Sequence, residues 1–81
     1  MPTVLRIRRY RIGFFSVDWI EPVHVHVSKR GCAAKFWLAP VRLASNYGFR
    51  SVDLKEIALI LETHENEILQ AWTDYFRRAT D

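Results

Sequence analysis

The chain has 81 residues, which is enough for one small domain spanning 1–81 and too few for two. Hydrophobic residues make up 49% of the sequence and three of them are Trp, which predicts a packed core and excludes a disordered chain. The net charge of +3 is mild, but Arg6, Arg8, Arg9 and Arg11 crowd the N-terminal end. This asymmetry suits an anionic partner as well as it suits an ordinary solvated surface.

The sequence also excludes several kinds of site and location. Cys32 is the single cysteine, so an internal disulfide is impossible, and no Cys/His spacing typical of zinc is present. Nothing in the sequence predicts a bound cofactor. No stretch approaches the length of a membrane span, and the N-terminus lacks the long apolar run of a signal peptide. We therefore expect a soluble, cytoplasmic protein that does not enter a membrane.

Residues 3–46 are rich in Val, Ile, Phe, Tyr and Trp between short turn signals, which predicts strands. The first hairpin would turn at Arg8–Arg9. A two-residue hairpin turn needs positive φ, which arginine disfavours, so this turn is either wider than two residues or strained. The register of a tight turn pairs Ile7 with Tyr10 and Leu5 with Ile12 on an apolar face, and Arg6 with Arg11 on the opposite face.

The stretch EPVHVHVSKRG, residues 21–31, places two histidines in a run of valines. A turn at Arg30–Gly31 would make the second hairpin. A one-residue slip would mix apolar and polar side chains on each face, so their polarity fixes the register. The apolar face then pairs Val25 with Phe36, Val27 with Ala34 and Val23 with Leu38, and the other face pairs His24 with Trp37 and His26 with Lys35.

Residues 39–51 connect the sheet to a helical region. Pro40 argues against a central strand here, although Val41 and Leu43 suit a short edge strand. Asn46 and Gly48 mark a turn before the helix, in which we expect Asn46 to have a structural role.

Residues 51–78 repeat apolar side chains at helical spacing. Ser51 is the expected N-cap of this helical region. The stretch ETHEN, residues 62–66, favours a break into two helices over one long helix, with Thr63 able to cap the second. The aromatic residues Trp72, Tyr75 and Phe76 lie on the apolar stripe, and we expect them in the core.

Together these elements predict an α+β fold. An antiparallel sheet of four to five strands is followed by one long or two shorter C-terminal helices, packed on one face of the sheet. A helical region of this length covers only the aliphatic face, so the second face is expected to be open to solvent or to a partner. A small domain with an open face and an edge strand could also form a homodimer. The residues expected on the open face are Arg6, Arg11, His24, His26, Lys35 and Trp37.

The open face carries the parts needed for metal-independent cleavage of RNA, in which a 2′-hydroxyl attacks the adjacent phosphate. His24 and His26 can hold one proton between them near neutral pH, as general acid and general base. Cations would neutralise phosphate and an exposed aromatic ring would stack a base. The residues that would bind RNA in this way are Arg6, Arg11, Lys35 and Trp37.

Two other interpretations stay open. The same face could bind a protein or a nucleic acid without catalysis. A His-x-His pair on a strand can also be half of the metal site of a hydrolase, but it needs a third ligand. Asp18, Glu21 and His64 are available, and none has a spacing that compels the choice. We rank the metal site below acid–base use and assign no metal ligand.

Four segments carry a resemblance to a known family: MPTVLRI at the start, EPVHVHV at 21–27, AKFWL at 34–38 and PVRLASNYGF at 40–49. On these segments the whole chain resembles small bacterial proteins of the domain-of-unknown-function family numbered 4160. It differs from the family pattern at two places. The first turn resembles a Gly-Gly in the family and is Arg8–Arg9 here, and Val23 stands where a second proline is common.

The resemblance implies a biological setting but no settled biochemistry. Members of the family look like partners of a second small protein, of family 2442, and such pairs are read as candidate toxin–antitoxin modules. We therefore expect a component of such a module, the toxin more than the antitoxin, that acts on RNA or on the ribosome. The segment around His24 and His26 is the most distinctive part of the family pattern.

Overall fold

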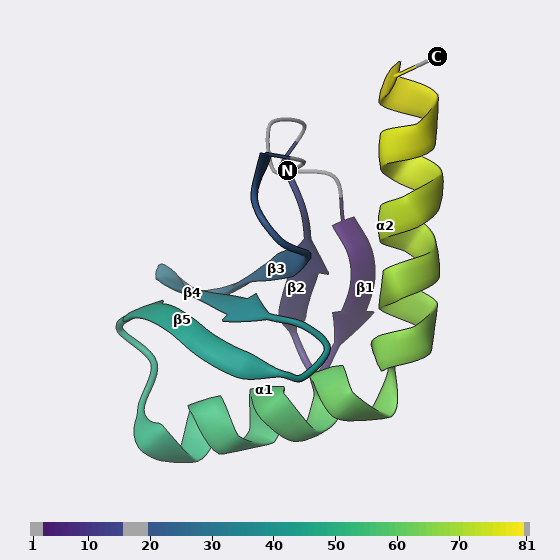
Figure 1. Ribbon diagram of the computed structural model, residues 1–81. Coiled ribbons are helices and arrows are strands. Elements are labelled where there is room, and N and C mark those ends of the chain that lie inside the picture. Colours follow the sequence, from purple (N-terminus) through teal and green to yellow (C-terminus); the bar gives the residue numbers. More distant parts are fainter. Residues whose placement is uncertain (1–2, 16–19, 81) are drawn as a thin grey trace.

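A computed structural model describes residues 3–15 and 20–80 and confirms the α+β fold. Five antiparallel strands form one sheet in the order β1-β2-β3-β4-β5, and two helices follow (Figure 1). The expected sheet of 3–46 reaches Tyr47, and the expected helical region of 51–78 reaches Thr80. The elements are β1 (Thr3–Ile7), β2 (Tyr10–Gly13), β3 (His24–Lys29), β4 (Cys32–Trp37), β5 (Arg42–Tyr47), α1 (Ser51–Thr63) and α2 (Glu65–Thr80).

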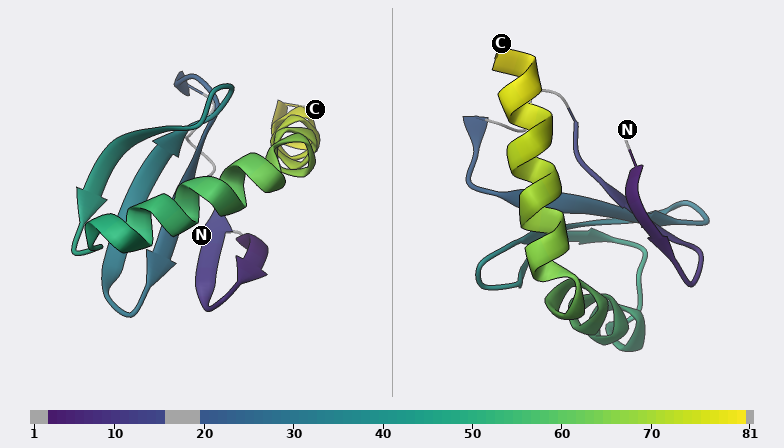
Figure 2. Two further views of the ribbon diagram at one scale, coloured as in Figure 1. Left: turned by 90° about the horizontal axis from the view of Figure 1, so that it is seen from below. Right: turned by 90° about the vertical axis from the view of Figure 1, so that its right-hand side faces the viewer.

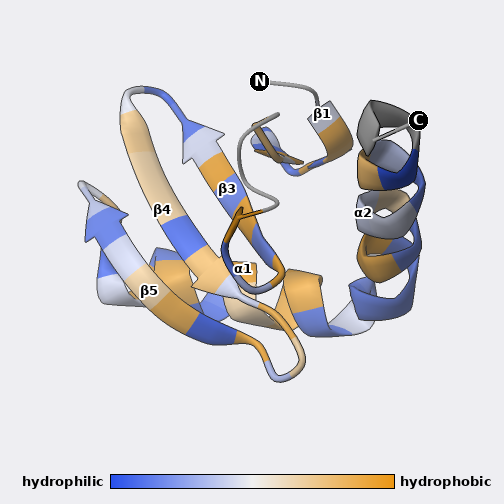
Figure 3. Ribbon diagram, turned by 45° about the horizontal axis from the view of Figure 1, so that its top comes forward, coloured by the Kyte–Doolittle hydropathy of each residue, from blue (hydrophilic) through white to orange (hydrophobic). Residues whose placement is uncertain are grey.

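Both hairpins have the registers that the sequence predicts. Alternating polarity along β3 and through Ala34, Lys35 and Phe36 of β4 fixes which side chains share a face, and bands of opposite hydropathy follow one another along β3 (Figure 3). The confirmed pairs are Ile7 with Tyr10, Leu5 with Ile12, Arg6 with Arg11, Val25 with Phe36, Val27 with Ala34, His24 with Trp37 and His26 with Lys35.

The first turn is tight and strained rather than wider. Arg8 and Arg9 have φ of 50° and 71°, in the left-handed region that costs a residue with a Cβ about 1 kcal/mol. The guanidinium of Arg8 lies 2.9 Å from a carboxylate oxygen of Glu56, so this turn is tied to α1.

Among the described strands, the edge strand β5 pairs only with β4, and it ends in a turn that Asn46 closes. The side-chain amide of Asn46 donates to the carbonyl of Phe49 at 3.0 Å and accepts from the Phe49 N–H at 3.1 Å. These two bonds confirm the structural role of Asn46. They also place Phe49 in the core, where its ring lies 5.9 Å from that of Tyr10.

The N-cap of α1 is Arg50, so the prediction that Ser51 caps the helix is wrong by one residue. Asp53 accepts a hydrogen bond from the Arg50 backbone N–H at 3.1 Å and one from its guanidinium Nε at 3.1 Å. These bonds, the side-chain bond first, hold the pKa of Asp53 below its usual value. Asp53 thus supplies the carboxylate of a capping box and satisfies the Arg50 N–H, whereas a Ser51 hydroxyl cap would accept from N–H groups inside the first turn.

The helical region breaks at His64, which confirms the prediction of two helices. The backbone N–H of His64 donates to the carbonyl of Ile60 at 3.1 Å and so ends α1. Thr63 does not cap α2, because its hydroxyl donates back to the carbonyl of Leu59 at 2.8 Å. Glu65, in the first turn of α2, accepts a bond from the Ala39 N–H at 3.1 Å and so ties the helix to the loop after β4.

The core lies between the sheet and the helices. Helix α1 crosses the aliphatic face, where its Ile57 and Leu61 are fully buried, while α2 turns away and rises past β1 (Figures 1 and 2). Phe14, directly after β2, packs against three aromatic residues of α2. Its ring centroid lies 5.2 Å from that of Trp72, 5.8 Å from that of Tyr75 and 5.9 Å from that of Phe76. The aromatic stripe of α2 therefore packs in the core as predicted.

Candidate functional site

The face of the sheet opposite α1 carries most of the side chains that the sequence predicts there, and we call it the polar face. Side chains alternate along a strand, so the pairing of β3 with β4 places His26 and Lys35 together on this face. Strand β5 adds two residues that the sequence did not assign: Ser45 lies opposite Lys35, and Tyr47 lies opposite Ala33.

The prediction that His24 points to solvent is wrong, because its side chain is 0% exposed. Its Nδ1 lies 2.8 Å from the backbone carbonyl of Pro22. A carbonyl oxygen can only accept, so Nδ1 carries the proton of that bond. Three rings surround the imidazole with centroids 5.1 to 5.5 Å away, those of His26, Trp37 and Trp72.

Trp72 explains the burial of His24. It comes from α2, and its centroid lies 5.4 Å from that of the imidazole at the first residue of β3. Strand alternation puts His24 on the polar face and helical spacing puts Trp72 in the core. Neither pattern shows that α2 rises far enough past the sheet to bring these two residues together. His24 therefore meets no ligand on the polar face directly.

Lys35 and Trp37 are more engaged with their neighbours than the sequence indicates. The Lys35 ammonium lies 2.6 Å from Oε1 of Glu21 and 4.5 Å from the ring centroid of Trp37. The same Glu21 oxygen lies 3.8 Å from Nε2 of His24. Glu21 was a candidate metal ligand, and here its carboxylate pairs with the Lys35 ammonium. The charge available from Lys35 for a phosphate is correspondingly reduced.

A groove of about 530 Å³ lies on the polar face. His26 is half-buried in it, and the ring of Phe15 meets the imidazole edge-on at 4.7 Å. Tyr47 is 75% exposed, so its ring offers a flat surface on which a base can stack. The polar and aromatic residues that line the groove are Arg11, Phe15, His26, Ser28, Lys35, Ser45, Asn46 and Tyr47.

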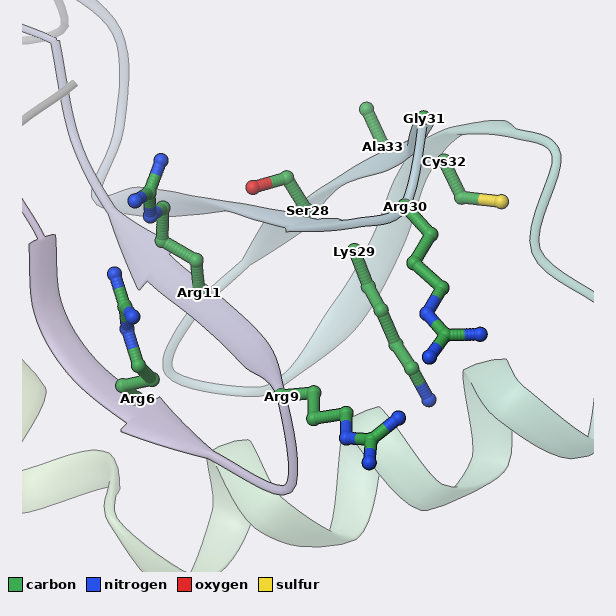
Figure 4. Close-up of a pocket in the computed structure, with 9 residues that line it drawn as sticks. All are labelled: Arg6, Arg9, Arg11, Ser28, Lys29, Arg30, Gly31, Cys32 and Ala33. Atoms are coloured by element: carbon green, nitrogen blue, oxygen red, sulfur yellow. The ribbon is translucent and has the colours of Figure 1, made fainter.

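A second hollow lies between the two hairpin turns, and we call it the hairpin-tip pocket. Because β2 runs antiparallel to β3, the turns at Arg8–Arg9 and Arg30–Gly31 lie at the same end of the sheet. The pocket has a volume of about 660 Å³ and shares Arg11, Ser28 and Ala33 with the groove, so the two hollows adjoin. Its basic residues are Arg6, Arg9, Arg11, Lys29 and Arg30 (Figure 4).

The sequence singled out Arg6 and Arg11 but not Arg9, Lys29 or Arg30 as binding residues. A prediction of the strand order would have identified these three residues as neighbours. Once the two hairpins are placed side by side in an antiparallel sheet, their turns must meet at one end. The sequence predicted each hairpin separately and did not order them.

The described residues offer no cluster of three His, Cys, Asp or Glu side chains that could hold a metal ion. His64, one candidate third ligand, lies between the helices with its Nδ1 3.1 Å from a carboxylate oxygen of Glu67. Asp18, another of the three candidates, lies outside the described residues.

Tyr10 lies beneath the hairpin-tip pocket, fully buried, with the ammonium of Lys29 4.6 Å from its ring centroid. Burial first, and then the neighbouring Glu56 carboxylate, raise the pKa of Tyr10 from 10.0 to about 12. As pH rises from 10 toward 12, the unfolded chain releases this proton and the folded chain keeps it, so the free energy of unfolding falls.

We therefore expect the wild type to lose stability above pH 10, by no more than about 1.4 kcal/mol per pH unit from this group. Tyr10→Phe keeps the ring and removes the titrating hydroxyl, so it should show a smaller loss over the same range. Urea unfolding of both proteins below and above pH 10 measures the difference. Parallel losses in the two proteins would show that another group is responsible.

The fold and this surface define a small α+β domain with a meander sheet, two C-terminal helices and a basic groove opposite α1. The chain belongs to a family described as a domain of unknown function, DUF4160, whose model matches residues 10–73. No curated protein and no solved structure matches the chain. Within the described ranges, no helix is long and apolar enough to cross a membrane.

Proposed function

We propose that this protein binds single-stranded RNA along the polar face, as a component of a toxin–antitoxin-like module. The observation that carries this proposal is that the hairpin-tip pocket and the groove adjoin at shared lining residues, which puts cations and aromatic rings along one path. Single-stranded RNA suits such a path, because its phosphates need cations and its unstacked bases need flat rings.

The residues along the path have distinct parts in this proposal. Arg6 and Arg11 hold phosphates, and Tyr47 stacks a base. Lys35 and Trp37 contribute less than the sequence predicts, because Lys35 already binds Glu21 and covers the indole ring. The main affinity is therefore expected at β1 and β2, with base contacts toward β5.

Cleavage of RNA by His24 and His26 stays a prediction, and we propose different roles for the two histidines. A general base must lie within hydrogen-bonding reach of the attacking 2′-hydroxyl. His26 lines the groove, so we propose it as that base. His24 packs behind it, with the two ring centroids 5.1 Å apart, and acts by positioning His26.

The resemblance that the sequence shows supplies the setting of the proposal: a cytoplasmic toxin held inactive by a small partner of family 2442. Such a toxin should arrest growth when it is induced alone in a bacterial host. We expect the wild type to arrest growth and Arg6→Gln/Arg11→Gln to restore it, because the RNA would no longer be held.

The control for this growth experiment is Arg42→Gln/Lys55→Gln, which removes the same charge from exposed residues outside the pocket and the groove. It should arrest growth like the wild type. Normal growth after induction of folded wild type would contradict the toxin role. Equal arrest by all three proteins would show that the polar face does not cause it.

A further inference from the structure

The hairpin-tip pocket has basic side chains that the fold does not neutralise. Several basic side chains near it do have carboxylate partners, as Arg8 does with Glu56 and Lys35 with Glu21. By contrast, no acidic side chain in the described part of the chain forms an ion pair with the four arginines of the pocket, Arg6, Arg9, Arg11 and Arg30. Like charges gathered in a hollow repel one another, and an anion would relieve this repulsion.

Backbone conformation makes two of these arginines unusual. Arg9 has φ of 71° and Arg30 has φ of 47°, where glycine or asparagine fits with less strain. Arg8 shares this conformation but ties the turn to α1 through Glu56. Arg9 and Arg30 form no such tie within the described residues, so the fold gives no reason for an arginine at either position. Strained residues of this kind are typical of binding sites.

The arrangement of the charges favours phosphate over a nucleobase. Arg9, Lys29 and Arg30 come from two different hairpins and direct their charged ends to the side of the pocket toward α1, away from the charged ends of Arg6 and Arg11 (Figure 4). The residues that line the pocket include no aromatic ring, whereas those of the groove include Phe15 and Tyr47. A base therefore finds a stacking surface in the groove and a phosphate finds its cations in the pocket.

We propose that the hairpin-tip pocket binds the terminal phosphate monoester of an RNA strand whose body lies in the groove. This inference rests on the proposed function and names the end of the strand that is recognised. A terminal phosphate carries nearly two negative charges near pH 7, against one for an internal phosphodiester, and so matches a cluster of cations better. The pocket lies at the hairpin end of the sheet, where a strand that follows the groove would terminate.

The test compares three RNAs of one sequence that carry a 5′-phosphate, a 3′-phosphate or only hydroxyl ends. We expect the wild type to bind one phosphorylated RNA about tenfold more tightly than the hydroxyl RNA. Arg9→Asn/Arg30→Asn should bind all three alike. Asparagine tolerates positive φ, so this variant keeps both turns while it removes both charges. The matched control, Arg42→Gln/Lys55→Gln, should retain the preference for phosphate.

A titration with inorganic phosphate, followed through the amide NMR signals of Arg9 and Arg30, separates failure of this inference from failure of the proposed function. RNA binding with no preference for a phosphorylated end would overturn the pocket assignment and leave RNA binding intact. Saturable phosphate binding without RNA binding would support the pocket and contradict the RNA proposal. Binding of neither ligand would contradict both.

Discussion

His24→Ala is expected to lower the free energy of unfolding by about 3 kcal/mol or more, which for a domain of this size corresponds to a fall in Tm of roughly 15 °C. The substitution removes a ring that three aromatic neighbours enclose and leaves a cavity in their place. It also removes the donor that Nδ1 provides to the Pro22 carbonyl at 2.8 Å. Thermal and urea unfolding measure both quantities.

His26→Ala is the matched control, because His26 lies two residues along the same strand and is only half-buried. We expect it to cost about 1 kcal/mol or less. Equal losses in the two variants would contradict the burial of His24. The larger loss of stability expected for His24→Ala also matters for any test of catalysis, since a loss of activity in a His24 variant would reflect unfolding. Only the His26 variant tests the acid–base chemistry.

Arg6→Gln/Arg11→Gln is expected to weaken binding of single-stranded RNA by about tenfold or more at low salt, and to make the salt dependence of binding shallower by about 1.4 in the log–log slope. The two arginines lie opposite each other on β1 and β2 and line the hairpin-tip pocket. Fluorescence anisotropy across a salt series measures both effects. Arg42→Gln/Lys55→Gln removes the same charge elsewhere, and an equal loss in that variant would show that only net charge matters.

The sheet could be predicted from the sequence because the pattern that fixes its register lies in residues that are close together in the chain. Apolar and polar side chains alternate through Val25, His26 and Val27 and again through Ala34, Lys35 and Phe36, so a single register keeps each face uniform. The break between the helices was also predicted, because polar residues interrupt the apolar stripe at 62–66.

The cap of α1 was predicted at Ser51 because a hydroxyl is a common cap, but the side chain of Asp53 can bond to the Arg50 N–H from inside the helix. Sequence patterns rank cap residues, but they do not decide between a hydroxyl that accepts from N–H groups in the first turn and a carboxylate that accepts from the N–H of the cap residue itself. The difference moves the cap by one residue and leaves the helix start unchanged.

The candidate site was harder to predict because it depends on contacts between distant segments. His24 is buried by Trp72, which is 48 positions later in the chain, and the direction in which α2 leaves α1 decides whether they meet. The hairpin-tip pocket likewise depends on which strands are neighbours. Arg9 and Arg30 belong to different turns, and only the antiparallel pairing of β2 with β3 brings the turns together.

The most direct test of RNA binding on the polar face is an NMR titration of the ¹⁵N-labelled protein with single-stranded RNA. We expect saturable shifts at the residues of the pocket and the groove, with Leu59 on the exposed surface of α1 as an unaffected reference. The amides expected to move are those of Arg11, His26, Ser28, Ala33 and Lys35. Shifts confined to the helices, or the absence of saturable shifts, would contradict the assignment of this face as the RNA-binding surface.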